Sequence, residues 1–232
     1  RSMIGIIGAM EVEVNALKEQ IIGAEVQTIS GVEYVSGRIG LKEVVVARCG
    51  IGKVFAALCA QTMILTYHPD ILINTGVAGT LCETLSIGDV AVSSAVVHHD
   101  LDSSALGDPL GMISGLDIIQ IPADEALAQM AKQCVEAEGL NCQIGVIASG
   151  DQFIGDGEKK AFIKNTFGAV ACEMEGAAIG HTAYVNGVRF VVIRAISDGA
   201  DDDSIMDFPA FCERAAEHSV KVTLALLENL CA

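Results

Sequence analysis

The chain has 232 residues, of which 51% are hydrophobic and 19% are charged, and this hydrophobic content excludes an intrinsically disordered protein. Its 14 Lys and Arg residues against 30 Asp and Glu residues give a formal net charge of −16. Because nucleic-acid binding requires a basic surface that neutralises phosphates, this charge argues against a nucleic-acid partner. No run of about 18 apolar residues is free of charges and turn signals, so we expect no membrane partner either.

The eight cysteines are dispersed, and no two of them form a CxxC pair. This distribution predicts neither a zinc site nor a disulfide framework, and we interpret the cysteines as small buried residues of a cytoplasmic protein. The first apolar run, Met3–Gly8, is too short for the apolar region of a signal peptide. No linker rich in proline, serine or charge divides the chain, so we expect one domain over residues 1–232.

Short aliphatic runs alternate with longer amphipathic stretches along the chain, which is typical of alternating strands and helices. Several predicted strands are apolar on both faces, which indicates an α/β fold of three layers with helices on both sides of a central sheet. In chain order we predict a strand at Met3–Gly8, a helix at Glu11–Gln20, strands at Glu33–Gly37 and Glu43–Cys49, a helix at Lys53–Tyr67, strands at Ile71–Thr75 and Val90–Val97, a helix at Ala123–Glu138, a strand at Gln143–Ser149, a helix at Glu158–Asn165, a strand at Ala169–Cys172, a helix at Glu175–Asn186, a strand at Phe190–Ala195 and a helix at Pro209–Leu230.

The last of these helices has the clearest start. Asp207 lies near the predicted N-cap and Pro209 in the first turn, where the missing N–H has no helical partner to lose. Apolar residues recur at roughly helical spacing, and we expect this stripe to pack on the sheet: Phe211, Ala215, Val220, Leu224 and Leu227.

Between His98 and Gln120 the periodicity gives way to Asp, Ser, Gly and Pro. This stretch of about twenty residues is longer than ordinary loops, which usually means that it has a function of its own. We therefore expect the segment His98–Gln120 to be a lid or a binding surface.

Glycines gather near the ends of predicted strands, where the backbone can approach a ligand closely. None of these segments contains the GxGxxG fingerprint of a dinucleotide site, and Gly52 and Lys53 lack the surrounding residues of a phosphate-binding loop. The sequence therefore predicts neither NAD nor ATP as a cofactor. The segments are Gly5–Gly8, Gly50–Lys53, Gly76–Gly79 and Gly150–Asp151.

Acidic residues follow three of the predicted strands. Because the carboxyl ends of parallel strands meet at one edge of a sheet, we expect these side chains to converge in one crevice. Arg194 lies inside an aliphatic strand, and a buried guanidinium needs an anionic or polar partner, so it belongs either to this crevice or to a structural ion pair. The acidic residues are Glu11, Glu13, Glu173, Glu175 and Asp198.

A series of collinear motifs spans nearly the whole chain: Gly5–Glu13, Gly50–Lys53, Asn74–Gly79, Ser149–Ile154, Glu173–Ala178 and Arg194–Asp198. Together they resemble the motifs of the 5′-methylthioadenosine/S-adenosylhomocysteine nucleosidases. The resemblance implies the nucleoside phosphorylase/hydrolase fold, with a twisted mixed sheet surrounded by helices. It also implies a homodimer, a small-molecule adenine nucleoside as substrate, and neither a metal nor a cofactor.

The family's catalytic roles fall on residues whose chemistry fits them. Glu13 matches the base that activates water for attack on the anomeric carbon. Asp198 matches the acid that protonates N7 of adenine, so that the base leaves as a neutral molecule. Glu175 matches the ligand of the ribose hydroxyls and would stabilise the oxocarbenium-like transition state.

The resemblance also implies which residues contact the substrate. The ring of Phe153 should stack on adenine while the backbone of Ile154 reads the purine edge. An apolar wall around the 5′-thioalkyl group is implied for Met10, Ile51, Met174 and Phe208. The remaining substrate-binding positions are Ala78, Gly79, Glu173, Arg194 and Ser197.

Two features depart from the family pattern. Val77 stands where the family often has serine, so a side-chain contact near the attacking water is missing. In the family, the segment matching His98–Gln120 supplies aromatic residues to the 5′ pocket of the partner subunit. Here that segment contains Leu106 and Asp108 and no aromatic residue.

These observations predict a hydrolase that cleaves 5′-methylthioadenosine and S-adenosylhomocysteine to adenine and the 5-thioribose product, in methionine salvage. One alternative is a phosphorylase, although phosphate would be repelled by Glu11 and Glu13. Others are a nucleosidase that prefers 5′-deoxyadenosine or an aminofutalosine-type nucleoside, and a nucleoside-binding sensor without catalysis. A sensor would have lost Glu13 or Asp198, and both are present.

Overall fold

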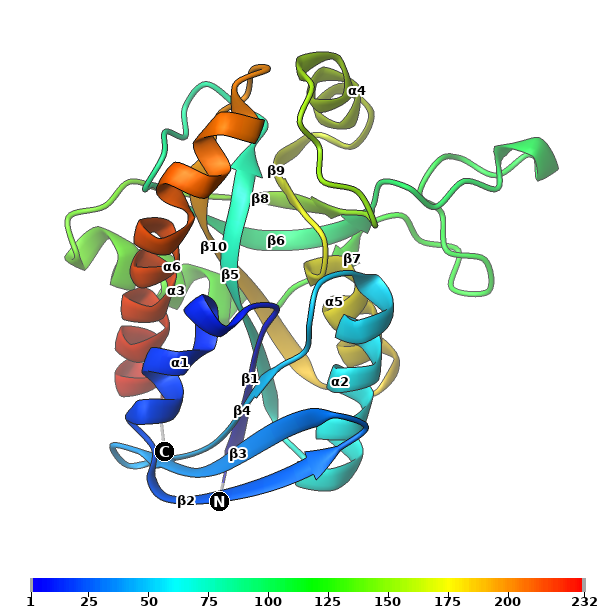
Figure 1. The fold of residues 1–232 in the computed structure, drawn as a ribbon. Coiled ribbons are helices and arrows are strands. Elements are labelled where there is room, and N and C mark those ends of the chain that lie inside the picture. Colours follow the sequence, from blue (N-terminus) through cyan, green and yellow to red (C-terminus); the bar gives the residue numbers. More distant parts are fainter. Residues whose placement is uncertain (1, 231–232) are drawn as a thin grey trace.

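A mixed β-sheet forms the centre of the molecule, and helices cover both of its faces (Figure 1). The computed structural model describes residues 2–230. Its strands are β1 (Met3–Gly8), β2 (Ile22–Ile29), β3 (Val32–Ile39), β4 (Lys42–Arg48), β5 (Ile71–Thr80), β6 (Val90–His98), β7 (Ile121–Pro122), β8 (Cys142–Ser149), β9 (Ala169–Glu173) and β10 (Arg189–Asp198). Its helices are α1 (Glu11–Glu19), α2 (Lys53–Tyr67), α3 (Glu125–Ala137), α4 (Gly157–Phe167), α5 (Gly176–Val185) and α6 (Ser204–Asn229), with a 3₁₀ turn, η1, at Ser104–Leu106.

The sheet combines an open half with a closed half. In the open half, β1 pairs in parallel with β4 and β5, and β3 and β2 extend the sheet with antiparallel pairs. In the other half, β10 pairs with both β5 and β6, so that the chain of pairs from β5 through β9, β8 and β6 to β10 closes into a ring. The mixed sheet that the family resemblance implies is confirmed.

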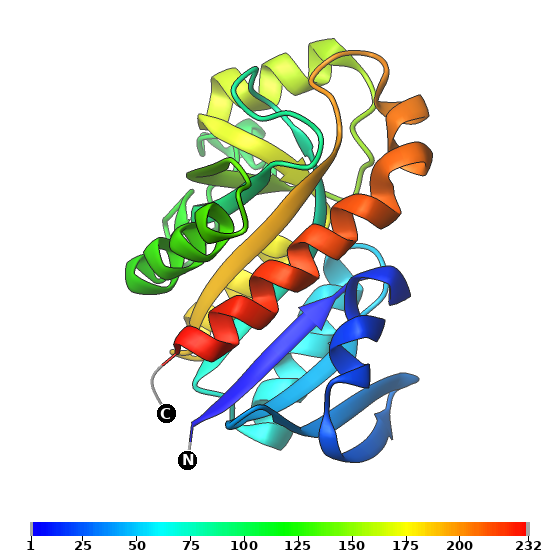
Figure 2. The same ribbon diagram turned by 90° about the vertical axis from the view of Figure 1, so that its left-hand side faces the viewer.

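Two layers of helices enclose the sheet. On one face lie α1, α3 and α6, whose buried residues Val14, Ala131 and Leu226 belong to one core cluster, and Figure 2 shows α6 and α1 running across this face. The other face carries α2 and α5, with Met63 and Ile179 in a second cluster. The predicted three-layer α/β fold is confirmed. Within the described part of the chain, no helix combines the length and apolar character that crossing a membrane requires.

Two strands are absent from the sequence-based prediction. Strand β2 lies at the edge of the sheet, pairs with β3 alone, and is exposed at every residue except the half-buried Ile29. Because neither face of β2 is buried, its residues have no strict apolar and polar alternation to reveal it. The two-residue β7 is too short to produce any pattern.

Strands β5 and β10 are longer than predicted, and the extra residues carry part of the cavity described below. The predicted strand Ile71–Thr75 continues to Thr80 through Gly76 and Gly79, and β10 continues to Asp198. The added residues pair with each other in parallel register. Because glycine has low strand propensity, the strand pattern of β5 ends at Gly76 in the sequence, although the pairing of β5 with β10 continues beyond it.

Helix α6 begins at Ser204, earlier than the predicted start, so Pro209 lies inside the helix and not in its first turn. Ser204 is fully buried, and its hydroxyl donates to the carbonyl oxygens of Gly199 and Asp201 at 3.1 Å. Lys160, which is distant in the sequence, also donates to this hydroxyl, and together these contacts fix the start of the helix upstream of the proline. Similarly, Glu175 is the N-cap of α5 and not its first helical residue.

The predicted irregular segment is observed. His98 still belongs to β6, and residues 99–120 contain η1 and a single bridge between Ile113 and Ile118. This segment projects from the body of the molecule, at the right of Figure 1. Leu106 at its η1 turn is 87% exposed, so this side chain contributes nothing to the core of its own chain.

Candidate active site

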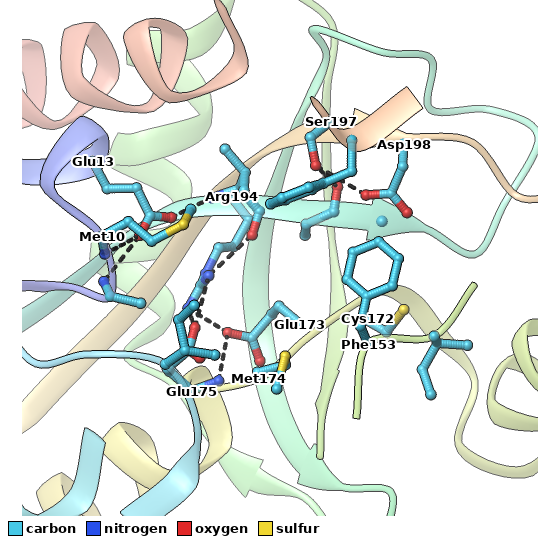
Figure 3. Close-up of a pocket in the computed structure, with 17 residues that line it drawn as sticks. Met10, Glu13, Phe153, Cys172, Glu173, Met174, Glu175, Arg194, Ser197 and Asp198 are labelled. Carbon is cyan, nitrogen blue, oxygen red and sulfur yellow. Dashed lines mark hydrogen bonds and ion pairs between the residues drawn. The ribbon is translucent and has the colours of Figure 1, made fainter. Parts of the chain in front are cut away.

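A cavity of about 320 Å³ opens where β1, β5, β9 and β10 end (Figure 3). The residues to which sequence analysis gave a catalytic or substrate-binding role line this cavity: Met10, Glu13, Ile51, Ala78, Gly79, Phe153, Ile154, Glu173, Met174, Glu175, Arg194, Ser197, Asp198 and Phe208. Ala9, Val77 and Cys172 also line it, and sequence analysis did not assign these three. The expectation that Glu11 lies in the same crevice is wrong: its side chain is exposed at the start of α1, where it lies 3.8 Å from the guanidinium of Arg48.

The carboxylate of Glu13 is oriented by backbone groups. As the third residue of α1, it turns back to the start of the helix, where the first N–H groups have no helical partner. Its Oε1 accepts from the amides of Ala9 at 2.9 Å and Met10 at 2.8 Å, and its Oε2 accepts from Val77 at 3.0 Å. Burial raises the pKa of Glu13, while Arg194 and these backbone donors oppose the shift.

Two glycines of β5 make room for the charged side chains. A Cβ atom at Gly76 would collide with Oε2 of Glu13 and lie 2.9 Å from Nη1 of Arg194. At Gly79 it would lie 2.5 Å from Oδ2 of Asp198. Neither glycine has a positive φ, so the close approach of side chains explains them and backbone strain does not.

Arg194 is the cation of the cavity wall. It is 1% exposed, and its guanidinium donates to Oδ1 of Asn74 at 2.6 Å and to the carbonyl of Val77 at 3.0 Å. It also forms ion pairs with Glu173 and, at 3.4 Å, with Glu175. Burial opposes the charge, yet the surrounding carboxylates raise the pKa of Arg194. Sequence analysis predicted that Arg194 belongs either to the crevice or to a structural ion pair. Both descriptions apply, because the ion pairs of Arg194 lie in the crevice itself.

Glu173 and Glu175 flank the junction between β9 and α5. Oε2 of Glu173 accepts from the amide of Gly176 at 2.7 Å, and its Oε1 accepts from the Ser149 hydroxyl. Oε2 of Glu175 accepts from the amide of Gly52 at 2.8 Å. Burial raises the pKa of Glu175, against the opposing effect of the nearby guanidinium. Figure 3 shows both side chains next to the end of the Arg194 side chain, on the same part of the cavity wall.

Asp198 lies at the other end of the cavity from Glu13 (Figure 3). Its Oδ1 accepts from the Ser197 hydroxyl at 2.9 Å, and its Oδ2 forms a buried ion pair of 3.1 Å with Lys160. Sequence analysis missed Lys160. It stands in an amphipathic helix beside Lys159, as exposed lysines commonly do, and no local signal marks it as buried.

The apolar part of the wall surrounds the mouth of the cavity. Phe153 is 48% exposed, and its ring meets that of Phe208 edge to face with centroids 5.3 Å apart. Ile51 is also partly exposed, at 55%, while Ile154 is buried. A flat ring with a free face and an adjacent apolar rim can hold a planar, weakly polar ligand.

Acidic groups dominate the charged lining. Glu13, Glu173, Glu175 and Asp198 line the cavity, and Arg194 is the one Lys or Arg among its described lining residues. Over residues 2–230, no cluster of three His, Cys, Asp or Glu residues has a geometry that would hold a metal ion. The arrangement can accept protons and stabilise a cation, and it disfavours a dianionic ligand.

Comparison with known proteins finds the family that the sequence motifs resemble, and the similarity covers nearly the whole chain. The sequence pattern of the family described as "Phosphorylase superfamily" matches residues 3–228. A 5′-methylthioadenosine/S-adenosylhomocysteine nucleosidase of Staphylococcus saprophyticus is 42% identical over 229 residues, which are 98% of this chain and 100% of that protein.

Two solved structures from Helicobacter pylori are also similar. A mutant of its 5′-methylthioadenosine/S-adenosylhomocysteine nucleosidase in which an aspartate is replaced by asparagine, with 5′-methylthioadenosine in the active site, superposes with a TM-score of 0.95 at 36% identity, covering 99% of this chain and 100% of that one. A structure described as its futalosine hydrolase superposes with a TM-score of 0.93 at 37% identity, covering 99% and 98% of the two chains.

Proposed function

This chain belongs to the 5′-methylthioadenosine/S-adenosylhomocysteine nucleosidase family of the phosphorylase superfamily, and from that premise we propose that it hydrolyses the N-glycosidic bond of these two nucleosides. The products are adenine and the 5-thioribose compound, which places the reaction in methionine salvage. The observation that carries the proposal is that Glu13 and Asp198 lie at opposite ends of one cavity, with the buried carboxylate Glu175 also in its wall.

Glu13 is the general base. A carboxylate has about four positions at which it can accept hydrogen bonds. Backbone amides of Ala9, Met10 and Val77 occupy three of them, which orients the group and leaves one for a water molecule. Because the contact at Val77 is made by its backbone amide, replacing the family's frequent serine by valine leaves this support intact.

Asp198 is the general acid. It transfers a proton to N7 of adenine as the bond between the anomeric carbon and N9 breaks, so that the electron pair stays on a neutral base. The oxygen atoms of Asp198 are held by Ser197 and Lys160, and Gly79 leaves space beside them. The partly exposed ring of Phe153 offers one face for stacking on the adenine, and the backbone of Ile154 reads its edge.

Glu175 binds the ribose hydroxyls and stabilises the positive charge that develops on the ribose ring. Arg194 and the amide of Gly52 hold its two oxygens, so the negative charge is oriented before substrate binds. Glu173 supports this arrangement from behind, since its oxygens are engaged by the Ser149 hydroxyl, Arg194 and the start of α5.

The lining favours water over phosphate as the nucleophile. A phosphorylase needs a cationic site for its dianionic substrate, whereas Glu13, Glu173 and Glu175 surround the corresponding part of this cavity. Arg194 is already paired with the last two of these carboxylates. Phosphorolysis is therefore the disfavoured alternative.

A second substrate class is supported by the similarity to the futalosine hydrolase structure of Helicobacter pylori, at 37% identity. On the 5′ side of the cavity Ile51 is 55% exposed and leaves the apolar rim open, and the projecting segment 99–120 contains no Phe, Tyr or Trp. Such a pocket would accept 5′ groups larger than methylthio, which includes a futalosine-type nucleoside.

We propose further that the protein is a cytoplasmic homodimer. The outer faces of α2 and α5 expose apolar side chains that a second copy would cover: Val54, Phe55, Leu58, Leu65, Tyr184 and Val185. Two-fold pairing is the commonest arrangement of identical subunits, and it would bring segment 99–120 of one protomer toward the 5′ side of the other cavity. The described cysteines are all unpaired, which suits a reducing compartment.

The test is adenine release from a panel of 5′-substituted adenosines, with and without inorganic phosphate. We expect rapid release from 5′-methylthioadenosine and S-adenosylhomocysteine at a rate that phosphate does not change. Formation of ribose 1-phosphate derivatives would assign a phosphorylase. A clear preference for aminofutalosine over both thio-nucleosides would assign the second substrate class.

A further inference from the structure

We propose that Lys160 is a positioning residue for the general acid: its buried ammonium holds Asp198 in the orientation that proton transfer to adenine requires. This inference rests on the proposed function, because it assigns a partner to the acid of that reaction. Lys160 does not line the cavity, and it therefore acts through Asp198 and not on the substrate.

The burial of Lys160 is the first observation. The residue lies in the first turn of α4 and is 2% exposed, although lysine is among the residues least often found fully buried. Removing an ammonium group from water is strongly unfavourable unless the charge is paired and hydrogen-bonded. A lysine that only supported the helix would gain more by reaching the solvent, as Lys159 and Lys164 do on the same helix.

The contacts of the ammonium are the second observation. It has three N–H donors and meets three acceptors: Oδ2 of Asp198 at 3.1 Å, the carbonyl of Gly199 and the hydroxyl of Ser204. All three acceptors lie at the end of β10 or the start of α6, while Lys160 itself belongs to α4. One side chain therefore fixes the strand end that carries the acid against both neighbouring helices.

The surroundings of the Asp198 carboxylate are the third observation. Lys160 holds Oδ2 from the protein side, and the Ser197 hydroxyl holds Oδ1 at 2.9 Å. A Cβ atom at Gly79 would lie 2.5 Å from Oδ2, so the carboxylate lies directly against the backbone of β5, where only glycine leaves room for it. The carboxylate is thereby restricted to an orientation in which it lines the cavity, and productive proton transfer needs positioning to within about 0.5 Å.

The charge of Lys160 also serves the chemical step. For the chemical step Asp198 first takes up a proton from solvent. It then gives this proton to N7 as the bond from the anomeric carbon to N9 breaks, the bonding electron pair stays on adenine, which leaves neutral, and Asp198 returns to its anionic form. An ammonium at 3.1 Å stabilises that anion at a site where little water can do so. A neutral side chain at this position would supply the contact without the charge.

The experiment compares two substrates across the variants Lys160→Met, Asp198→Asn and the double variant. For 5′-methylthioadenosine we expect Lys160→Met to lower kcat by about 10- to 100-fold, a part of the 10²–10⁴-fold that acid–base catalysis contributes. For p-nitrophenyl riboside, whose leaving group needs little protonation, we expect a change of less than about twofold. Lys164→Met, which removes an exposed lysine of the same helix, is the matched control and should leave both rates unchanged.

Equal losses on the two substrates, or no loss on 5′-methylthioadenosine, would overturn the proposal. The double variant keeps the test decisive if Lys160→Met does not fold, since it removes both members of the buried ion pair. With Asp198 already replaced, loss of Lys160 should change kcat by less than about twofold, and a further tenfold loss would mean that Lys160 does not act through the acid. If Asp198→Asn alone leaves the rate on 5′-methylthioadenosine unchanged, the proposed function fails whatever Lys160 does.

Discussion

Around the active-site cavity, charged side chains are buried and paired within the chain, whereas on α2 and α5 apolar side chains are exposed. Arg194 and Lys160 are at most 2% exposed and each contacts carboxylates directly. On the outer face, Val54 is 70% exposed and Leu58 is 60% exposed. The first region satisfies its own electrostatic requirements, while the second leaves apolar surface that the chain itself does not cover.

This difference indicates which parts of the site one protomer provides and which part depends on a second protomer. The residues proposed for catalysis and ribose binding, Glu13, Glu175 and Asp198, each have hydrogen-bond partners within their own protomer that orient them. The 5′ side is bordered by the exposed Ile51, and in our proposal a second protomer completes it. Substitutions in the cavity should therefore affect the chemical step, and substitutions on the outer face should affect assembly and 5′ selectivity.

The largest effect is expected from Glu13→Gln. The amide has nearly the same shape but cannot take a proton from water, so kcat should fall by about 10²–10⁴-fold while nucleoside binding is retained. Single-turnover kinetics and equilibrium binding of 5′-methylthioadenosine measure the two quantities. Glu11→Gln is the matched control, since Glu11 is exposed and its ion pair with Arg48 is long, at 3.8 Å. A variant that releases adenine at the wild-type rate would contradict the role of Glu13.

A similarly large effect, on assembly and not on the chemical step, is expected from Leu58→Glu on the outer face of α2. In a two-fold interface the substitution occurs twice, and each buried leucine contributes about 1.5–3 kcal/mol, so the dimer should dissociate at least 100-fold more readily. Sedimentation at several protein concentrations measures this. Leu41→Glu is the control, because Leu41 is 88% exposed and lies in the turn between β3 and β4. A fully active wild-type monomer would contradict the proposed assembly.

The pH dependence should change activity by at most about tenfold per pH unit. Burial raises the pKa of Glu13 above its ordinary value of 4.5. Because a general base acts only when ionised, kcat/KM should be lost as the pH falls through this raised pKa, so the midpoint of the acid limb should lie above 4.5. A pH profile of kcat/KM on 5′-methylthioadenosine locates it. A midpoint at or below 4.5 would mean that protonation of Glu13 does not cause the loss of activity at low pH.

The smallest effect is expected from Leu106→Phe. Leu106 is 87% exposed on the projecting segment, so it can influence a 5′ pocket only in the partner protomer. A ring at this position should add about 0.5–1.5 kcal/mol of aromatic contact, which corresponds to roughly two- to tenfold in selectivity. The measured quantity is the ratio of kcat/KM for 5′-methylthioadenosine to that for S-adenosylhomocysteine. An unchanged ratio would exclude segment 99–120 from the 5′ pocket.

Much of the fold could be predicted because its elements have local patterns. Strand β1 and helix α2 have the predicted bounds. β1 is a short continuous aliphatic run, which is typical of a buried strand, and α2 is a longer apolar stretch that begins directly after Gly52 and ends shortly before Pro69. The edge strand β2 has no buried face and therefore no pattern. Helix α6 starts at Ser204, where the distant Lys160 contacts the serine hydroxyl, and the local sequence of residues 204–208 does not predict this start.

The candidate site shows the same division between local sequence and tertiary contacts. The sequence by itself determined which chemical groups stand at the strand ends, because acidic residues that follow aliphatic runs can be recognised from the order of the residues alone. Only the tertiary structure decided how they are used. Lys160 reaches Asp198 across 38 positions of the chain and Val77 supports Glu13 across 64, and such contacts exist only after the sheet has closed and the helices have packed on it. Burial then raises the pKa of Glu13 and requires each buried charge to have a partner. Neither effect can be predicted from the local sequence, because the burial itself comes from the tertiary structure.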